Sequence, residues 1–344
     1  MAVVLPADEY AVGAEIAHGG MGSVLRAEDR KLGRVVAMKV MRLESAASDA
    51  RRARFVREAT VLARLEHPNI VPIHELGLDA DNRLYYTMKL VQGRTLQGIL
   101  NGLRRRDADF VGHYTLDRLL TIFRKVCDAI ALAHARGVIH RDLKPDNIMV
   151  GEFGEVLVMD WGLAKNLGDA RQAADEAAVA ARAVSDGAAE RFAEVAGSNL
   201  MRSVALTLEG DVMGTPLYMS PEQAQGQSAE VDRQSDVFSL GGILYALLTL
   251  HPPVSGGTAD EVIGRIRRGE IPPPTVYNAP SKSRGKGGSN GATAADPKQF
   301  QPLPHCPGHK VPAALSAVTM RALAVDKGRR YATVAHLSAD VEAY

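Results

Sequence analysis

The sequence predicts an α+β fold with two lobes, a small lobe of antiparallel strands with one helix and a larger lobe built mainly from helices. Short alternating or valine-rich runs, punctuated by glycines, fill most of the first 91 residues, where one segment has helical spacing. From residue 92 onward most apolar residues recur at helical spacing. We therefore expect lobes at residues 1–91 and 92–344.

Composition and charge exclude several classes of protein. The 344 residues are 46% hydrophobic and 24% charged, as in an ordinary globular protein, and the net charge is +1. A charge so near zero argues against nucleic acid or a membrane surface as the main partner. Two cysteines cannot build a disulfide framework, which favours a reducing, cytoplasmic location.

No membrane or export segment is expected in this sequence. The start, MAVVLPADEY, lacks the basic region and long apolar run of a secretory signal. The most apolar run, residues 237–250, is too short to cross a bilayer and predicts a buried helix. The sequence stops at Tyr344 in mid-pattern, which is compatible with one domain of a longer protein and leaves open a membrane anchor beyond Tyr344.

The small lobe is expected to contain five strands and one helix in a fixed order. The helix has apolar residues at helical spacing, and Ser48 or Asp49 can cap its start. The expected elements are a hairpin at 10–20 and 22–29, a strand at 33–43, the helix at 48–67, and strands at 69–76 and 83–91.

The large lobe is expected to contain a long helix and two unusual segments. Apolar residues recur at helical spacing over 116–137, and Gly137 suits the end of this helix. Residues 167–197 are rich in alanine and glutamate, which favours helix, with an interruption at 185–187. Residues 278–300 are rich in glycine, serine and lysine and predict a mobile loop.

Two features of the small lobe allow alternative interpretations. The glycine-rich segment AHGGMGSV (17–24) lies between two expected strands, where it is compatible with phosphate binding or with a plain turn. Lys39 stands in an apolar strand, and a buried lysine needs a partner, for which Glu58 on the following helix is the candidate. Alternatively, Lys39 is an exposed residue at the edge of the sheet.

The segment HRDLKPDN (140–147) gathers groups suited to phosphoryl transfer. The carboxylate of Asp142 can accept a proton from a hydroxyl nucleophile, and Lys144 can stabilise a phosphoryl group. The amide oxygen of Asn147 suits a hard cation, and Asp160, at the end of an apolar strand, supplies a second ligand.

In this order, the motifs resemble those of eukaryotic-type serine/threonine protein kinase domains, in the style of bacterial members. The resemblance covers roughly residues 10 to 343, and each short motif gains weight from its place in the series. The matching segments are AHGGMGSV, VAMK ending at Lys39, the helix with Glu58, HRDLKPDN, MDWG (159–162), GTPLYMSPEQ (214–223), VDRQSDVFSLG (231–241) and DKGRRYAT (326–333).

The resemblance implies a bilobal protein-kinase-like fold and an ATP-dependent, non-specific serine/threonine protein kinase that acts in signalling. ATP and Mg²⁺ or Mn²⁺ would be the cofactors, and serine- or threonine-containing proteins the substrates. The implied catalytic residues are Lys39, Glu58, Asp142, Lys144, Asn147 and Asp160, of which Asn147 and Asp160 would bind the metal. The implied nucleotide contacts are Ile16, Gly19, Gly20, Gly22, Val24, Ala37, Lys39, Met88, Lys89 and Val91.

The resemblance also implies a regulated activation segment at residues 160–222. Arg141 would pair with a phosphate in this segment, and Ser203 or Thr207 would be autophosphorylated. Thr215 would contact Asp142 and help to select a hydroxyl acceptor. Glu222 and Arg330 would form a structural ion pair, and relatives permit a homodimer through the small lobe.

Departures from the family pattern keep two alternatives open. Ala17 replaces the first glycine of the loop, and Trp161 replaces the usual phenylalanine after Asp160. These changes support a pseudokinase, a binding module with the same fold, but every chemical residue is intact. A small-molecule kinase is disfavoured because GTPLYMSPEQ resembles a protein-docking segment.

One cluster outside these motifs contains possible metal ligands. His305, Cys306 and His309 lie in PLPHCPGHKVP, but a zinc site needs a fourth ligand, and the sequence offers no second cluster. The prolines favour a rigid surface loop instead.

Overall fold

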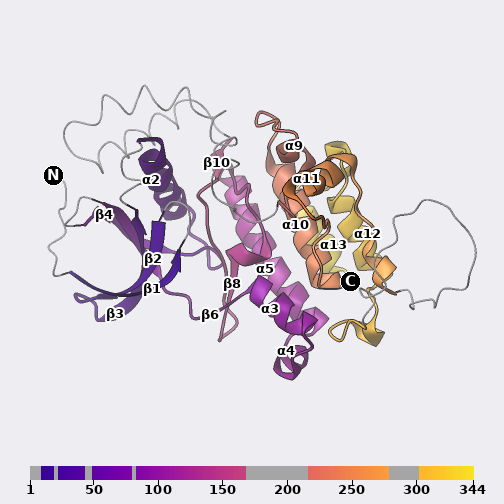
Figure 1. The fold of residues 1–344 in the computed structure, drawn as a ribbon, viewed down its shortest axis with the longest axis horizontal. Coiled ribbons are helices and arrows are strands. Elements are labelled where there is room, and N and C mark those ends of the chain that lie inside the picture. The colour runs from indigo at the N-terminus through magenta and orange to yellow at the C-terminus, as the bar shows by residue number, and fades with distance from the viewer. Residues whose placement is uncertain (1–8, 19–21, 43–48, 80–82, 168–215, 279–301) are drawn as a thin grey trace, which may run out of the picture. The chain divides into compact units, whose positions relative to one another are not determined.

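The computed structural model has the expected α+β fold (Figure 1). It describes residues 9–18, 22–42, 49–79, 83–167, 216–278 and 302–344. The chain forms two compact units, one of Met1–Gly93, Ala129–Asp142 and Met149–Gly214, the other of Arg94–Asp128, Leu143–Ile148 and Thr215–Tyr344. The lobe boundary expected at residue 91 stays a prediction. The expected helix at 167–197 lies outside the described residues from 168 onward, and the expected loop at 278–300 from 279 onward.

The first unit is built on an antiparallel sheet with the strand order β1-β2-β3-β5-β4. Its strands are β1 (Tyr10–His18), β2 (Gly22–Asp29), β3 (Arg34–Met41), β4 (Ile73–Leu78) and β5 (Leu84–Lys89). Strand β4 starts four residues later than the sequence predicted. The reason is that Ile70 forms a parallel bridge with Val158 and Asn69 accepts the Val158 N–H, so this stretch pairs elsewhere.

The two faces of β3 have different surroundings because successive side chains in a strand point to opposite sides. Val36, Met38 and Val40 belong to a buried apolar cluster with Ala27 and Tyr85. Ala37 and Lys39 alternate with them and point to the other face. Lys39 and Ala37 therefore lie on the face of β3 opposite this apolar cluster.

Helix α2 (Asp49–Arg64) packs against β4 and β5. Phe55, Ala59 and Leu62 are buried, as their helical spacing predicted. The ring of Phe55 lies 5.1 Å from that of Tyr86 on β5, measured between centroids. Of the two expected caps, Asp49 begins the helix, and Ser48 lies outside the described residues.

Short strands place the polar segments that follow them. The strands are β6 (Gly93–Thr95), β7 (Val138–Ile139), β8 (Ile148–Gly151), β9 (Val156–Val158) and β10 (Lys165–Asn166). β10 pairs antiparallel with β7, and β8 neighbours β9. Asp142 follows β7 and Asp160 follows β9, so two of the predicted chemical groups come directly after buried strands.

Helices dominate the second unit. The α-helices after β6 are α3 (Leu96–Arg104), α4 (Ala108–His113), α5 (Leu116–Ala135), α9 (Pro221–Ala224), α10 (Arg233–Thr249), α11 (Ala259–Arg268), α12 (Ala313–Ala322) and α13 (Val334–Glu342). Single 3₁₀ turns are η1 (Pro145–Asn147), η2 (Pro274–Asn278), η4 (Pro307–His309) and η5 (Lys327–Arg329). Every residue of α10 from Ser235 to Thr249 is buried, which confirms the buried helix predicted from the apolar run. No helix of the described residues is long and apolar enough to span a membrane.

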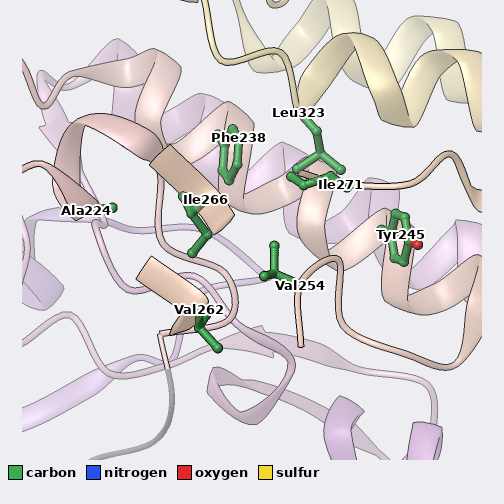
Figure 2. Packing of buried hydrophobic residues seen from close by; sticks show 8 residues of the cluster. All are labelled: Ala224, Phe238, Tyr245, Val254, Val262, Ile266, Ile271 and Leu323. Carbon is green, nitrogen blue, oxygen red and sulfur yellow. The ribbon is translucent and has the colours of Figure 1, made fainter. Parts of the chain in front are cut away.

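An apolar cluster packs α10 against its neighbours (Figure 2). Phe238 and Tyr245 come from α10, and Val262 and Ile266 come from α11. Leu323, which follows α12, completes the contact in Figure 2. Burial of these side chains supplies the main driving force for packing this unit.

A buried ion pair joins α9 to the segment after η5. Arg330 donates to both carboxylate oxygens of Glu222 at 2.9 Å, and Ser235 donates to Glu222 at 2.6 Å. Burial alone would raise the pKa of Glu222, but Arg330 and Ser235 outweigh it and lower that pKa. The pair anticipated from the sequence is therefore present and ionised.

The PLPHCPGHKVP segment is not wholly a surface loop, and that part of the prediction was wrong. His305 and Cys306 are buried, whereas His309 is exposed. The His305 Nε2 lies 2.8 Å from the Leu247 carbonyl oxygen. The backbone carbonyl of His305 accepts a hydrogen bond from the Leu116 N–H. These backbone contacts turn half of the segment inward. Among the described residues, no cluster of three or more histidine, cysteine or carboxylate side chains is arranged to hold a metal.

We expect His305 to make the protein less stable in mild acid. Burial lowers the pKa of His305 from 6.5 to about 4, so below pH 6.5 the unfolded chain binds a proton that the folded chain refuses. The free energy of unfolding should therefore fall as the pH drops through this window, by about 2 kcal/mol between pH 7.5 and 5. Urea unfolding at both pH values measures this, and His305→Gln should remove this component.

The matched control is His309→Gln, because His309 is exposed in the same segment. It should leave the pH dependence as in the wild type. An identical acid loss in His305→Gln and the wild type would contradict the assignment.

Candidate active site

Five side chains share the second face of the sheet. Strand register places Val24 of β2 and Tyr86 of β5 on either side of Lys39. Met88 of β5 lies directly opposite Ala37 in the same way. Four residues expected to contact a nucleotide therefore line one face of the sheet. Tyr86, which was not predicted, lies on the same face.

Lys39 is buried rather than exposed at an edge. Strand β3 has neighbours on both sides, and the Lys39 side chain is 14% exposed. Its Nζ donates to both carboxylate oxygens of Glu58 on α2, at 2.7 and 2.9 Å. The exposed-edge alternative is wrong, and the buried ammonium has the partner that its burial requires.

Tyr86 is a third member of this ion pair. Its hydroxyl donates to Glu58 Oε1 at 2.8 Å, the oxygen that also accepts the shorter bond from Lys39. The Lys39 Nζ lies 5.6 Å from the centre of the Tyr86 ring. Glu58 is thus held between a cation and a hydroxyl, which fixes its carboxylate.

The surroundings of Lys39 favour its charged form. Burial by itself would lower the pKa of Lys39, but the carboxylates of Glu58 and Asp160 outweigh burial and raise that pKa above its ordinary value. The positive charge of Arg54 on α2 acts in the opposite direction and lowers the pKa of Lys39. Lys39 therefore stays an ammonium at neutral pH, as a group that must grip anions requires.

Two residues of the predicted catalytic segments have left-handed backbone, Arg141 next to Asp142 and Asp160 itself. The φ angle is 70° at Arg141 and 58° at Asp160. Residues other than glycine rarely adopt this region, and such conformations cluster at functional sites, where the surrounding structure must hold them.

His140 supplies part of that support. It is fully buried, its Nδ1 accepts the Asp142 N–H at 3.3 Å, and its Nε2 lies 3.1 Å from the Met159 carbonyl oxygen. This geometry fits the tautomer with its proton on Nε2. The imidazole also packs on Trp161, with ring centroids 4.6 Å apart. One side chain thus links the backbone beside Asp142 to the backbone beside Asp160.

The glycine of β2 has a packing reason that the sequence did not reveal. A Cβ on Gly22 would lie 2.4 Å from the Val40 carbonyl oxygen, so only glycine allows β2 to approach β3 this closely. Gly19 and Gly20 lie outside the described residues, and the phosphate role of all three stays a prediction.

Three of the expected nucleotide contacts, Ile16, Lys89 and Val91, differ in exposure and bonding. Ile16 on β1 is 50% exposed, and Val91 is half-buried after β5. The Lys89 N–H donates to the Pro72 carbonyl, so a base contact through Lys89 would have to use its carbonyl group. The Lys89 ammonium lies 3.8 Å from Glu155.

The predicted catalytic residues divide between the two units. Lys39, Glu58, Asp142 and Asp160 belong to the first unit. Lys144 and Asn147 belong to the second, where Lys144 precedes the turn η1 and Asn147, which is buried, ends it. The predicted regulatory residues Ser203, Thr207 and Thr215 lie outside the described residues.

Tyr86 and Arg54 were missed by the sequence reasoning. Tyr86 could have been found from strand register, because it faces Lys39 across the sheet. Arg54 could have been found from helical spacing, because it lies one turn before Glu58 on α2. Neither residue belongs to a recognised short motif.

Known proteins resemble this chain along nearly its whole length. A family model described as "Protein kinase domain" matches residues 10–186. Serine/threonine-protein kinase PknD of Protochlamydia amoebophila is 36% identical over 99% of this chain. The protein of the same name from Chlamydia pneumoniae is 31% identical over 98%. The chain spans less than a third of these relatives, 30% and 31% of their lengths respectively.

Tyr86→Phe tests whether the hydroxyl holds Glu58. The change keeps the ring and removes one hydrogen bond to a buried carboxylate, so the free energy of unfolding should fall by about 1 to 2 kcal/mol. The neighbouring Tyr85 is the matched control, because its buried hydroxyl has no hydrogen-bond partner among the described residues. Chemical denaturation should show little change for Tyr85→Phe, and equal losses in the two variants would contradict the account.

Proposed function

This chain belongs to the protein kinase domain family, and we propose that it transfers the γ-phosphate of ATP to serine or threonine hydroxyls of proteins. The names of its relatives support the serine/threonine class. Lys144 supports it too, because the corresponding lysine is typical of that class and would neutralise charge on the transferred group.

The buried Lys39–Glu58 pair carries this proposal. Phosphoryl transfer depends on positioning and charge neutralisation, and it needs a fixed cation at the phosphates. Here the Glu58 carboxylate accepts two hydrogen bonds from the Lys39 ammonium and fixes it on the face of the sheet that also holds Val24, Ala37 and Met88. In this proposal Lys39 grips the α- and β-phosphates, and the apolar residues of that face contact the adenine.

The polar residues present fit a hard divalent cation. Mg²⁺ prefers oxygen ligands and is usually held by one or two side chains together with substrate phosphates. Asp160 offers an exposed carboxylate, and Asn147 offers an amide oxygen. These two residues would hold Mg²⁺ or Mn²⁺, which would offset negative charge on the phosphates.

Asp142 is the proposed base for the acceptor hydroxyl. The Asp142 N–H donates to His140, and this hydrogen bond restricts the position of the backbone that carries the carboxylate. Thr215, in the segment that would dock the protein substrate, is proposed to contact Asp142. The family resemblance supports this role.

Regulation and assembly extend the proposal. Arg141 would bind a phosphate placed on Ser203 or Thr207 by autophosphorylation, and this would link the domain to signalling. A homodimer through the small lobe and a cytoplasmic location for this domain remain predictions.

Phosphosite mapping with a generic protein acceptor and ATP tests the proposed activity. The wild type should label serine and threonine, and Asp142→Asn should lower kcat by roughly a hundred- to ten-thousandfold. Lys39→Met should remove labelling by losing the grip on ATP. Phosphate found between residues 185 and 215 would support autophosphorylation.

A wild-type protein that binds ATP but labels no protein would favour the pseudokinase alternative. Transfer to small hydroxylated metabolites without protein labelling would favour the small-molecule kinase. Either outcome would contradict the proposed activity.

A further inference from the structure

Helix α2 carries a second polar contact one turn before Glu58. Arg54 Nε donates to the carbonyl oxygen of Gly162 at 2.8 Å. Residues four apart on a helix share a face, so Arg54 and Glu58 point to the same side of α2. Through these two side chains, α2 contacts both the strand of Lys39 and the segment that carries Asp160.

The segment from Val158 to Gly162 is fixed at several points. The Val158 N–H donates to the Asn69 carbonyl, which anchors the strand end. Trp161 is buried, and its indole N–H points to the Val158 carbonyl oxygen at 3.4 Å. Arg54 holds the next carbonyl, that of Gly162. Asp160 keeps its unfavourable φ of 58° between these anchors.

Electrostatics place Arg54 among the acids of the site. Burial lowers the pKa of Arg54, while Asp160, Glu58 and Asp142 act in the opposite direction. A guanidinium stays charged at physiological pH in any case. Arg54 and Lys39 are thus two cations that both interact favourably with Glu58 and Asp160.

We propose that Arg54 is a positioning residue that ties the placement of Asp160 to the position of α2. If α2 moves, the Glu58 bond to Lys39 and the Arg54 bond to Gly162 weaken together, so the phosphate grip and the metal ligand are assembled or lost as one. The catalytic meaning of this tie depends on the proposed function, but the tie itself does not.

Two substitutions separate the hydrogen bond from the charge. In Arg54→Gln the amide nitrogen occupies the place of Nε along the side chain, so the donor remains and the charge is lost. Arg54→Met puts a methyl carbon at that place and removes both. The two variants are similar in length and differ mainly in the hydrogen bond to Gly162.

Trp161 reports on the segment directly because it is the only tryptophan in the sequence. Arg54→Met should shift the Trp161 emission to longer wavelength and make it more accessible to acrylamide, as the buried indole loosens. Arg54→Gln should stay close to the wild type. Arg57→Met, at an exposed position on the same helix, is the control and should leave the emission unchanged.

Circular dichroism establishes that each variant is folded, and Arg54→Leu replaces Arg54→Met if the latter is not. Equal emission changes in the donor-bearing and donor-free variants would overturn the proposal, as would no change in the donor-free variant. These outcomes need no enzymatic activity, so they stand even if the chain transfers no phosphate.

Steady-state kinetics then test the consequence for catalysis. Losing this charge-assisted bond should lower kcat for Arg54→Met roughly tenfold or more, and Arg54→Gln should lose less. When Glu58→Gln is already present, the further loss from Arg54→Met should shrink, because both bonds report the same position of α2. Fully additive losses would overturn the coupling.

Discussion

The buried ion pair between Lys39 and Glu58 is the constraint on which the rest of the site depends. An ammonium in an apolar strand is tolerable only with a fixed counter-ion, and Glu58 comes from a separate helix. The pair therefore determines where α2 must lie against the sheet. Tyr86 tightens it from the neighbouring strand, so a helix and two strands must be in place for one carboxylate to be held.

The segments bearing Asp142 and Asp160 are held by a second set of contacts. His140 joins their backbones, and Trp161 packs against its ring. The left-handed backbone at Asp160 persists because its neighbours are anchored on both sides. In this arrangement apolar packing and backbone hydrogen bonds position the segments that carry the two acids.

The sequence predicted most of the architecture because its strongest signals are local. Alternation in β3, helical spacing in α2 and α5 and the apolar run of α10 depend on neighbouring residues, and those elements appear where they were expected. The Lys39–Glu58 pair was anticipated from the cost of burying a lysine and from the family pattern.

What escaped prediction depends on contacts between distant segments. The late start of β4 follows from pairing with Val158, and the inward turn at His305 follows from contacts with Leu247 and Leu116. The sequence pattern assigns Gly22 to a phosphate-binding loop. The structure gives a separate reason for glycine, because the Val40 carbonyl oxygen leaves no room for a Cβ. Tyr86 was identified only when the strand register was known. Arg54 lies one turn before Glu58 in the sequence, but its contact with Gly162 required the structure.

The most direct measurement of the central claim is kcat/KM for ATP in Glu58→Gln, with protein acceptor saturating. Removing one partner of a buried ion pair leaves the other uncompensated, so kcat/KM should fall about a hundredfold or more while the protein remains folded. A value within about twofold of the wild type would mean that Lys39 needs no partner to hold the phosphates, which would contradict the account.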